Sequence, residues 1–188
     1  DESNPESSET EIDARTIMTM MTIERLAPQT YKIAELLDPA FSAYLRMAHV
    51  DEIIYPREYS RFLLASSVSS PGISHAVYDL LTVETACLLT TVPIPEELVG
   101  RTFADVIRHF DEAGPARTIC VGIIENTGNI HALRRRAKID AQKTPEYRNV
   151  IGRLNNVRKI SSNQPMLNPG DHYVVPPFAM AVVVRSDA

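Results

Sequence analysis

Several features that mark common protein classes are scarce or missing in this sequence. Only two of its 188 residues are cysteines, none is tryptophan, and the first glycine is Gly72. No run of about 18 apolar residues occurs, so no membrane span is predicted, and the acidic, serine-rich start lacks the pattern of a signal peptide. Cys87 and Cys120 stand singly among apolar residues, which predicts buried thiols in a reducing, cytoplasmic compartment.

Catalytic motifs are missing as well. The five histidines show no HxxxH or HxH spacing, and the chain has no GxSxG motif. His49 lies in a turn that enters a strand, where a hydrogen-bonded structural role is expected. The sequence therefore predicts that this chain is not an enzyme.

The overall charge disfavours nucleic acid as a partner. The net charge is −5 and the sequence pI is about 5.5, whereas phosphate binding needs a concentrated basic surface.

Residues 1–55 predict the C-terminal half of a Rossmann-like lobe. An acidic segment over residues 1–15 leads into a helix from about Ile12 to Ala27, whose apolar residues cover most of its circumference and predict burial on more than one side. A strand at residues 31–36, a second helix that begins at Asp38-Pro39, and a strand at residues 51–55 follow.

Two strands cannot form a complete parallel sheet, because such a sheet needs more strands and cover on both faces. We therefore expect that the N-terminal half of this lobe is missing from the chain. Its first strand would carry the glycine-rich phosphate-binding turn, so binding of a nucleotide of the NAD or ATP class stays undecided.

Residues 56–83 predict a helical hairpin with a turn at residues 69–72. Its strongly apolar faces favour a dimer contact with a second copy of the chain, and packing onto the chain's own sheet is the alternative. Residues 84–188 predict a small α+β domain. Its strands lie at residues 85–93, 117–125, 172–175 and 179–185, and Thr102 caps a helix. A polar, basic insertion at 126–164 interrupts this domain.

Three phrases in this order resemble the RCK domain, the regulator of potassium conductance, also called the TrkA type. They are LRMAHVDEIIYP at Leu45–Pro56, VPIPEELVGRTFADV at Val92–Val106 and PGDHYVV at Pro169–Val175. The resemblance implies an α/β fold with a Rossmann-like lobe, a helical crossover hairpin and a small α+β C-terminal lobe. The insertion is longer than the turn usual in the family.

The resemblance also implies a function. RCK domains form cytosolic gating rings, typically of eight lobes, on the cytoplasmic side of the cell inner membrane, and convert ligand binding into a pull on a potassium pore. A peripheral TrkA- or KtrA-like subunit of a potassium transporter is an alternative, and a tetramer or octameric ring is expected in either case. An effector-binding part of a transcription regulator or a dehydrogenase fragment fits less of the pattern.

Calcium is the ligand that the resemblance suggests. Some calcium-gated members use acidic residues at the positions of Asp1 and Glu35, although a further ligand position is occupied here by Leu37, so Asp38 or water would have to complete the site. The alternative is that these carboxylates are solvated or cap a helix.

The insertion carries nine basic residues against Asp140 and Glu146: Arg134, Arg135, Arg136, Lys138, Lys143, Arg148, Arg153, Arg158 and Lys159. It could meet anionic lipid head groups, an acidic neighbouring lobe or a nucleotide phosphate. The simpler expectation is a solvated, mobile loop.

Overall fold

The computed structural model describes residues 8–82, 87–112, 118–142 and 162–186, which fold into two compact units. The first unit comprises Asp1–Phe62 and Gly128–Ser162, and the second comprises Leu63–Thr127 and Asn163–Ala188. Among the described helices, none combines the length and the apolar character needed to cross a membrane.

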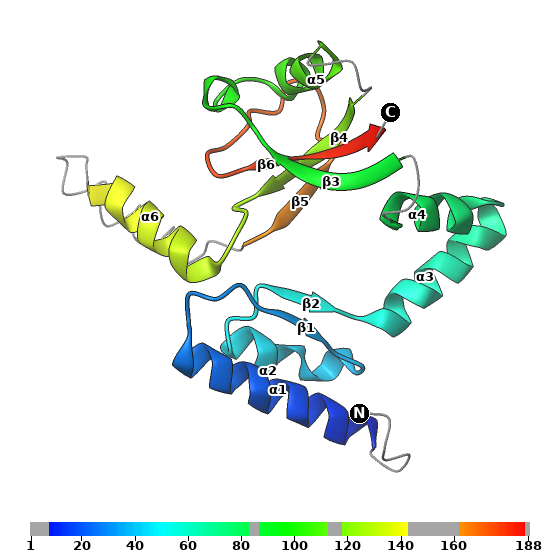
Figure 1. The fold of residues 1–188 in the computed structure, drawn as a ribbon, viewed down its shortest axis with the longest axis vertical. Coiled ribbons are helices and arrows are strands. Elements are labelled where there is room, and N and C mark those ends of the chain that lie inside the picture. The colour runs from blue at the N-terminus through cyan, green and yellow to red at the C-terminus, as the bar shows by residue number, and fades with distance from the viewer. Residues whose placement is uncertain (1–7, 83–86, 113–117, 143–161, 187–188) are drawn as a thin grey trace. The chain divides into compact units, whose positions relative to one another are not determined.

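The first unit is built around two parallel strands. Strands β1 (Ile33–Glu35) and β2 (Glu52–Ile54) pair in register from Ile33 opposite Glu52 to Glu35 opposite Ile54. Helix α1 (Glu9–Leu26), the short turn η1 (Pro39–Phe41) and helix α2 (Ser42–Met47) precede or connect them. Helices α1 and α2 lie together on one side of the strands (Figure 1).

The caps of α1 and η1 follow from the sequence. Ser8 accepts a hydrogen bond from the Glu11 N–H at 3.3 Å and begins α1, and Asp38 accepts one from the Ala40 N–H at 2.9 Å and begins η1. Pro28 follows the end of α1, because proline cannot donate to the helix ladder.

The apolar core of the first unit is small. Ala34, Leu36 and Leu45 are buried, and Ile17 and Met20 of α1 pack against them. The prediction that α1 is covered on more than one side is wrong for this chain, because Met18 and Leu26 on its other faces are 70% and 78% exposed.

Helices α3 (Pro56–Ser69) and α4 (Ile73–Leu81) form the predicted hairpin. They meet at a turn in which Gly72 has a φ of 88°, a conformation that favours glycine. Neither helix contains a buried residue. Six large apolar side chains on the two helices are exposed, namely Tyr59, Phe62, Leu64, Val68, Tyr78 and Leu81.

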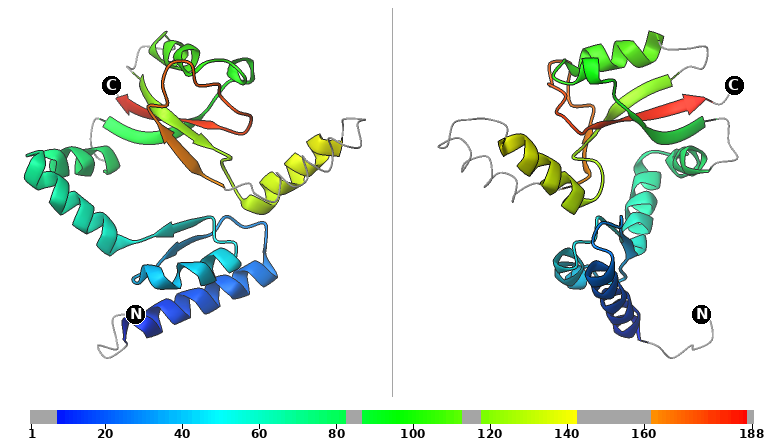
Figure 2. Two further views of the ribbon diagram at one scale, coloured as in Figure 1. Left: turned by 180° about the vertical axis from the view of Figure 1, so that it is seen from behind. Right: turned by 60° about the vertical axis from the view of Figure 1, so that its left-hand side comes forward.

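The second unit contains a four-stranded antiparallel sheet in the order β3-β6-β4-β5. Its strands are β3 (Cys87–Pro93), β4 (Thr118–Glu125), β5 (Gln164–Leu167) and β6 (Met180–Ser186). The turn η2 (Glu96–Leu98) and helix α5 (Phe103–Glu112) follow β3, and α5 lies over one face of the sheet (Figure 2).

The core of the second unit is larger and apolar. It contains eight buried residues, which are Ile94, Phe103, Val106, Cys120, Ile123, Val175, Ala181 and Val183. Gly122 lies at an irregularity of β4, and a Cβ there would come within 2.5 Å of the Met166 carbonyl oxygen on β5. A side chain at Gly122 would therefore collide with the backbone of β5.

Three predictions for the second unit differ from its structure. The strand expected at residues 172–175 is reduced to an isolated bridge between Val174 and Thr102, because the surrounding backbone bonds instead to the start of α5. Strand β5 was not predicted, and only its first residue, Gln164, lies in the expected insertion at 126–164. Cys87 is exposed on β3, whereas Cys120 is buried as predicted.

The start of the insertion is helical rather than a mobile loop. Helix α6 (Ile130–Gln142) belongs to the first unit and is anchored there by Asn129, whose side-chain oxygen accepts hydrogen bonds from the first turn. The insertion's remaining basic residues, from Lys143 to Lys159, lie outside the described residues.

Candidate functional site

Glu35 and Asp38 lie at the carboxyl edge of β1, as the sequence predicted, and both are exposed. Asp13 of α1 is 1% exposed, and its two carboxylate oxygens accept hydrogen bonds from the N–H groups of Leu37 and Asp38, each at 2.9 Å. The Asp38 carboxylate caps η1. Asp1 lies outside the described residues, so the calcium site stays a prediction.

A groove of about 530 Å³ lies beside this edge within the first unit. Thr16, Thr19 and Met20 of α1 line one part of it, and Ala34 and Glu35 of β1 line another. The groove places Glu35 next to a mixed polar and apolar surface.

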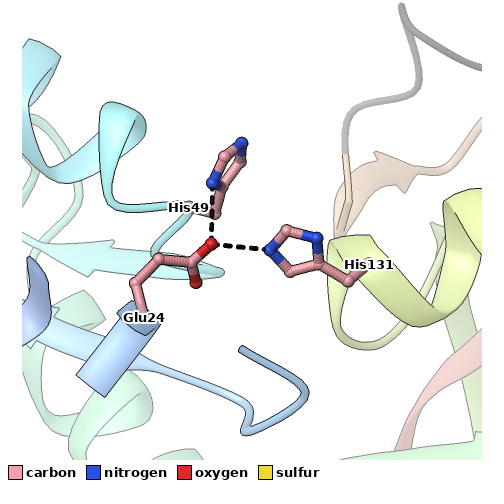
Figure 3. Close-up of side chains that lie close together, drawn as sticks. All are labelled: Glu24, His49 and His131. Carbon is pink, nitrogen blue, oxygen red and sulfur yellow. Dashed lines mark hydrogen bonds and ion pairs between the residues drawn. The ribbon is translucent and has the colours of Figure 1, made fainter. Parts of the chain in front are cut away.

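A second cluster, which we call the Glu-His-His cluster, consists of Glu24, His49 and His131 in the same unit (Figure 3). Glu24 Oε1 lies 3.0 Å from His49 Nδ1 and 2.9 Å from His131 Nε2. The three atoms all lie within 4.8 Å of one another, and the two imidazole rings meet edge to face with centroids 4.8 Å apart. Within the described part of the chain, no other group of three such ligand atoms is found.

Each member of the cluster is placed by a different element. Glu24 lies in the last turns of α1, and His131 lies in the first turn of α6. His49 lies in the turn between α2 and β2, where its φ of 47° is left-handed. Histidine is among the residues that tolerate this conformation better than most, although glycine adopts it at lower cost.

Asn129 holds the start of α6 against this part of the unit. Its Oδ1 accepts hydrogen bonds from the N–H groups of His131 at 3.0 Å and Ala132 at 3.3 Å, so it caps the helix. Its Nδ2 donates to the Thr30 carbonyl at 3.0 Å and to Asp51 Oδ2 at 3.3 Å. The position of His131 is therefore fixed by a buried side chain with partners on both sides.

Lys32 connects Glu24 of α1 to Asp51 and Glu52. Its ammonium group is buried, with 1% of the side chain exposed, and donates to Glu24 Oε2 at 2.7 Å. Its backbone N–H donates to Asp51 Oδ2 at 2.9 Å, and its carbonyl accepts from the N–H groups of Asp51 and Glu52. A closed polar ring therefore runs from Glu24 through Lys32, Asp51 and Asn129 to His131.

This ring keeps Glu24 ionised. Burial raises the pKa of the Glu24 carboxyl group, but the hydrogen bonds and charges of Lys32 and His131 outweigh it, so that its pKa lies below the ordinary value. An isolated buried ammonium would be costly, and the Glu24 carboxylate compensates the charge of Lys32. The cluster thus presents an anionic oxygen between two imidazole nitrogens.

Sequence reasoning did not bring the Glu-His-His cluster together. The hydrogen-bonded role predicted for His49 is confirmed, but its partner is 25 residues away and His131 follows 82 residues after His49. The relevant signal was a histidine at the turn position of the LRMAHVDEIIYP phrase, where glycine would adopt the backbone conformation more easily.

Three of the four arginine and lysine residues described on α6 are exposed, and Arg134 is partly buried. Arg135, Arg136 and Lys138 are exposed. These three side chains give the helix a positively charged surface.

Comparison with solved structures assigns the fold. The chain aligns with the human SLO3 gating ring over 96% of its own length, with a TM-score of 0.61 and 14% identity, and covers 31% of that chain. It also aligns over 93% of its length with the GsuK channel bound to NAD and over the same share with the GsuK RCK domain, at TM-scores of 0.34 and 0.31 and identities of 10% and 11%. The GsuK alignments cover 24% and 29% of those chains and are too loose to carry an argument.

No family model matches the sequence, and no curated protein is similar to it at the sequence level. Nearly the whole chain nevertheless shares the fold of part of the human SLO3 gating ring. This confirms the predicted fold class, a mixed α/β arrangement with one parallel and one antiparallel sheet.

Proposed function

We propose that this chain is a cytosolic, ligand-sensing gating-ring domain of a potassium channel, located on the cytoplasmic side of the cell inner membrane. The observation that carries the proposal is the similarity of its fold to the human SLO3 gating ring over 96% of the chain. The chain covers 31% of that structure, so the complete ring and its pore are part of the proposal.

The helical hairpin supports self-assembly. Helices α3 and α4 contain no buried residue, while Phe62, Val68 and Tyr78 are 66%, 87% and 67% exposed. An apolar surface of this kind is typical of an interface between subunits. We propose that the hairpin forms the dimer contact of a tetrameric or octameric ring.

Gating requires a ligand that binds two ring shapes with unequal affinity. The carboxyl edge of β1 suits this role, because ligands of open α/β sheets bind at the ends of the strands. Glu35 is exposed there beside the groove, and calcium is the ligand that its chemistry favours.

The test is potassium flux through the full-length protein in liposomes, with calcium titrated on the cytosolic side. We expect flux to change with calcium, and we expect Glu35→Ala to shift the calcium midpoint by about tenfold or more, which corresponds to about 1.4 kcal/mol of binding free energy. Glu96→Ala is the matched control, because it removes an exposed carboxylate of the second unit.

Protein that inserts correctly but conducts no potassium at any calcium level would contradict the channel proposal. Calcium-dependent flux that is equal in the Glu35→Ala protein and the wild type would retain the channel and remove the calcium site from this edge.

A further inference from the structure

The Glu-His-His cluster brings together side chains that commonly bind metal ions. Two imidazole nitrogens and one carboxylate oxygen converge within 4.8 Å. Two histidines and one glutamate are a recurring donor set for zinc with an open position, and imidazole also suits other divalent first-row ions. Calcium is disfavoured here, because it takes six to eight oxygen ligands.

We propose that Glu24, His49 and His131 form a binding site for a divalent transition-metal ion of the zinc class. The site does not depend on the proposed function, since it is argued from these side chains alone. Glu24 Oε1, His49 Nδ1 and His131 Nε2 are the ligand atoms, and water occupies the remaining position.

The distances fit this proposal with small movements. A tetrahedral ion with ligands at about 2.1 Å holds neighbouring ligand atoms about 3.4 Å apart. The two nitrogen-to-oxygen distances of 2.9 and 3.0 Å must widen by a few tenths of an ångström, and rotation of the rings brings the nitrogens closer. The side chains of Glu24, His49 and His131 are 20%, 38% and 26% exposed, so an ion can enter and the rings can turn.

The surrounding polar ring orients the ligands. Lys32 holds Glu24 Oε2 at 2.7 Å and leaves Oε1 directed at the imidazoles. Asn129 fixes the first turn of α6 through its bonds to His131 and Thr30. Partners of this kind set the direction of metal ligands and are a normal part of metal sites.

The backbone at His49 is a second, independent observation. Its left-handed φ of 47° costs conformational free energy for any residue except glycine. A role for the imidazole ring in binding would explain why a histidine occupies this turn position. Here its Nδ1 faces Glu24 Oε1 (Figure 3). The consequence of metal binding is that α6, which begins the basic insertion, becomes linked to α1 and to the α2–β2 turn.

The experiment uses full-length, untagged protein that has been stripped with a chelator and then freed of it. Zn²⁺ is titrated in competition with a chromophoric chelator, and Co²⁺ is titrated in parallel to record its visible spectrum. We expect one ion per chain and a Co²⁺ spectrum of a tetrahedral nitrogen and oxygen site.

Two variants each remove one proposed ligand and are expected to keep the fold. His49→Gly removes one ligand while relieving the left-handed backbone, and His131→Gln removes the other while leaving Asn129 to cap α6. Each is expected to weaken Zn²⁺ binding by about 100-fold or more, beyond the 10- to 100-fold typical of supporting residues. Glu24 is not substituted, because that would leave the buried Lys32 ammonium without its carboxylate.

His75→Ala is the matched control, since His75 is an exposed histidine of α4. Loss of the bound ion in both ligand variants, with unchanged circular dichroism and unchanged binding by the control, supports the site. Zn²⁺ binding in His49→Gly or His131→Gln with the affinity of the wild type, or wild-type protein that binds no stoichiometric Zn²⁺, overturns it. The readout is ion binding, so the result is independent of potassium flux.

Discussion

The two units of this chain bury different kinds of groups. The second unit has eight buried residues in one apolar cluster, while the first has three. All four buried polar or charged residues found in the described part of the chain, namely Asp13, Lys32, Asp51 and Asn129, belong to the first unit. One unit is therefore held mainly by apolar burial, and the other depends on specific polar bonds.

This difference separates stability from site formation. Apolar burial stabilises without direction, whereas buried polar groups need partners at defined positions. The first unit uses those defined positions to present Glu35 at one edge and the Glu-His-His cluster at another. The second unit offers no comparable cluster among its described residues.

The largest effect is expected in the apolar core of the second unit. Phe103 of α5 is 2% exposed and packs in the eight-residue cluster, so Phe103→Ala should lower the free energy of unfolding of this unit by about 4 kcal/mol. Hydrogen exchange should report the loss in the amides of β3, β4 and β6.

Ile107→Ala on the same helix is the control, because Ile107 is partly exposed and should lose much less. Equal losses in the two variants would show that the cluster around Phe103 does not dominate the stability of this unit.

A smaller effect is expected in the first unit. Leu45 of α2 is fully buried, so Leu45→Ala should cost about 3 kcal/mol. Because the two units have separate cores, hydrogen exchange should rise in β1 and β2 while β4 and β6 keep their protection.

Met47→Ala removes a comparable volume from an exposed position of the same helix and should leave exchange unchanged. If Leu45→Ala increases exchange equally in β4 and β6, the two units unfold together, and their cores do not stabilise them separately.

The elements that could be predicted are those in which the pattern is local. Helical spacing, the Asp38-Pro39 start and alternating or continuous apolar runs located α1 to α5 and the strands β1, β2, β3, β4 and β6. The many apolar residues of α1 led to a wrong prediction of its burial, because Met18 and Leu26 are largely exposed among the described residues.

What could not be predicted depends on contacts between distant residues. Helix α6 forms where the sequence predicts a polar loop. Asn129 caps this helix and also bonds to Thr30 and Asp51, which lie 99 and 78 residues away. The Glu-His-His cluster likewise assembles from three elements with no shared motif. A spacing rule for metal ligands detects only sites within one or two neighbouring elements.

The smallest effect is expected at the start of α5. Thr102 and Asp105 form a reciprocal cap: the Thr102 hydroxyl and N–H donate to Asp105 Oδ2 at 2.7 and 3.2 Å, and the Asp105 N–H donates to Thr102 Oγ1 at 3.4 Å. Thr102→Ala should lower the free energy of unfolding by about 1 kcal/mol, measured by urea denaturation. Thr102→Ser keeps the hydroxyl and should recover most of the loss.

This last prediction can be sharpened with pH. The hydrogen bonds from the Thr102 hydroxyl and backbone lower the pKa of Asp105, so its ionisation stabilises the fold above its unfolded pKa and this contribution is lost as pH falls through the folded pKa. Once Asp105 is protonated, its carboxylate bonds are absent from both proteins. The gap in stability between wild type and Thr102→Ala should therefore narrow in acid, with Thr102→Ser following the wild type. A gap that stays constant with pH would mean that the cap acts through the Thr102 side chain alone.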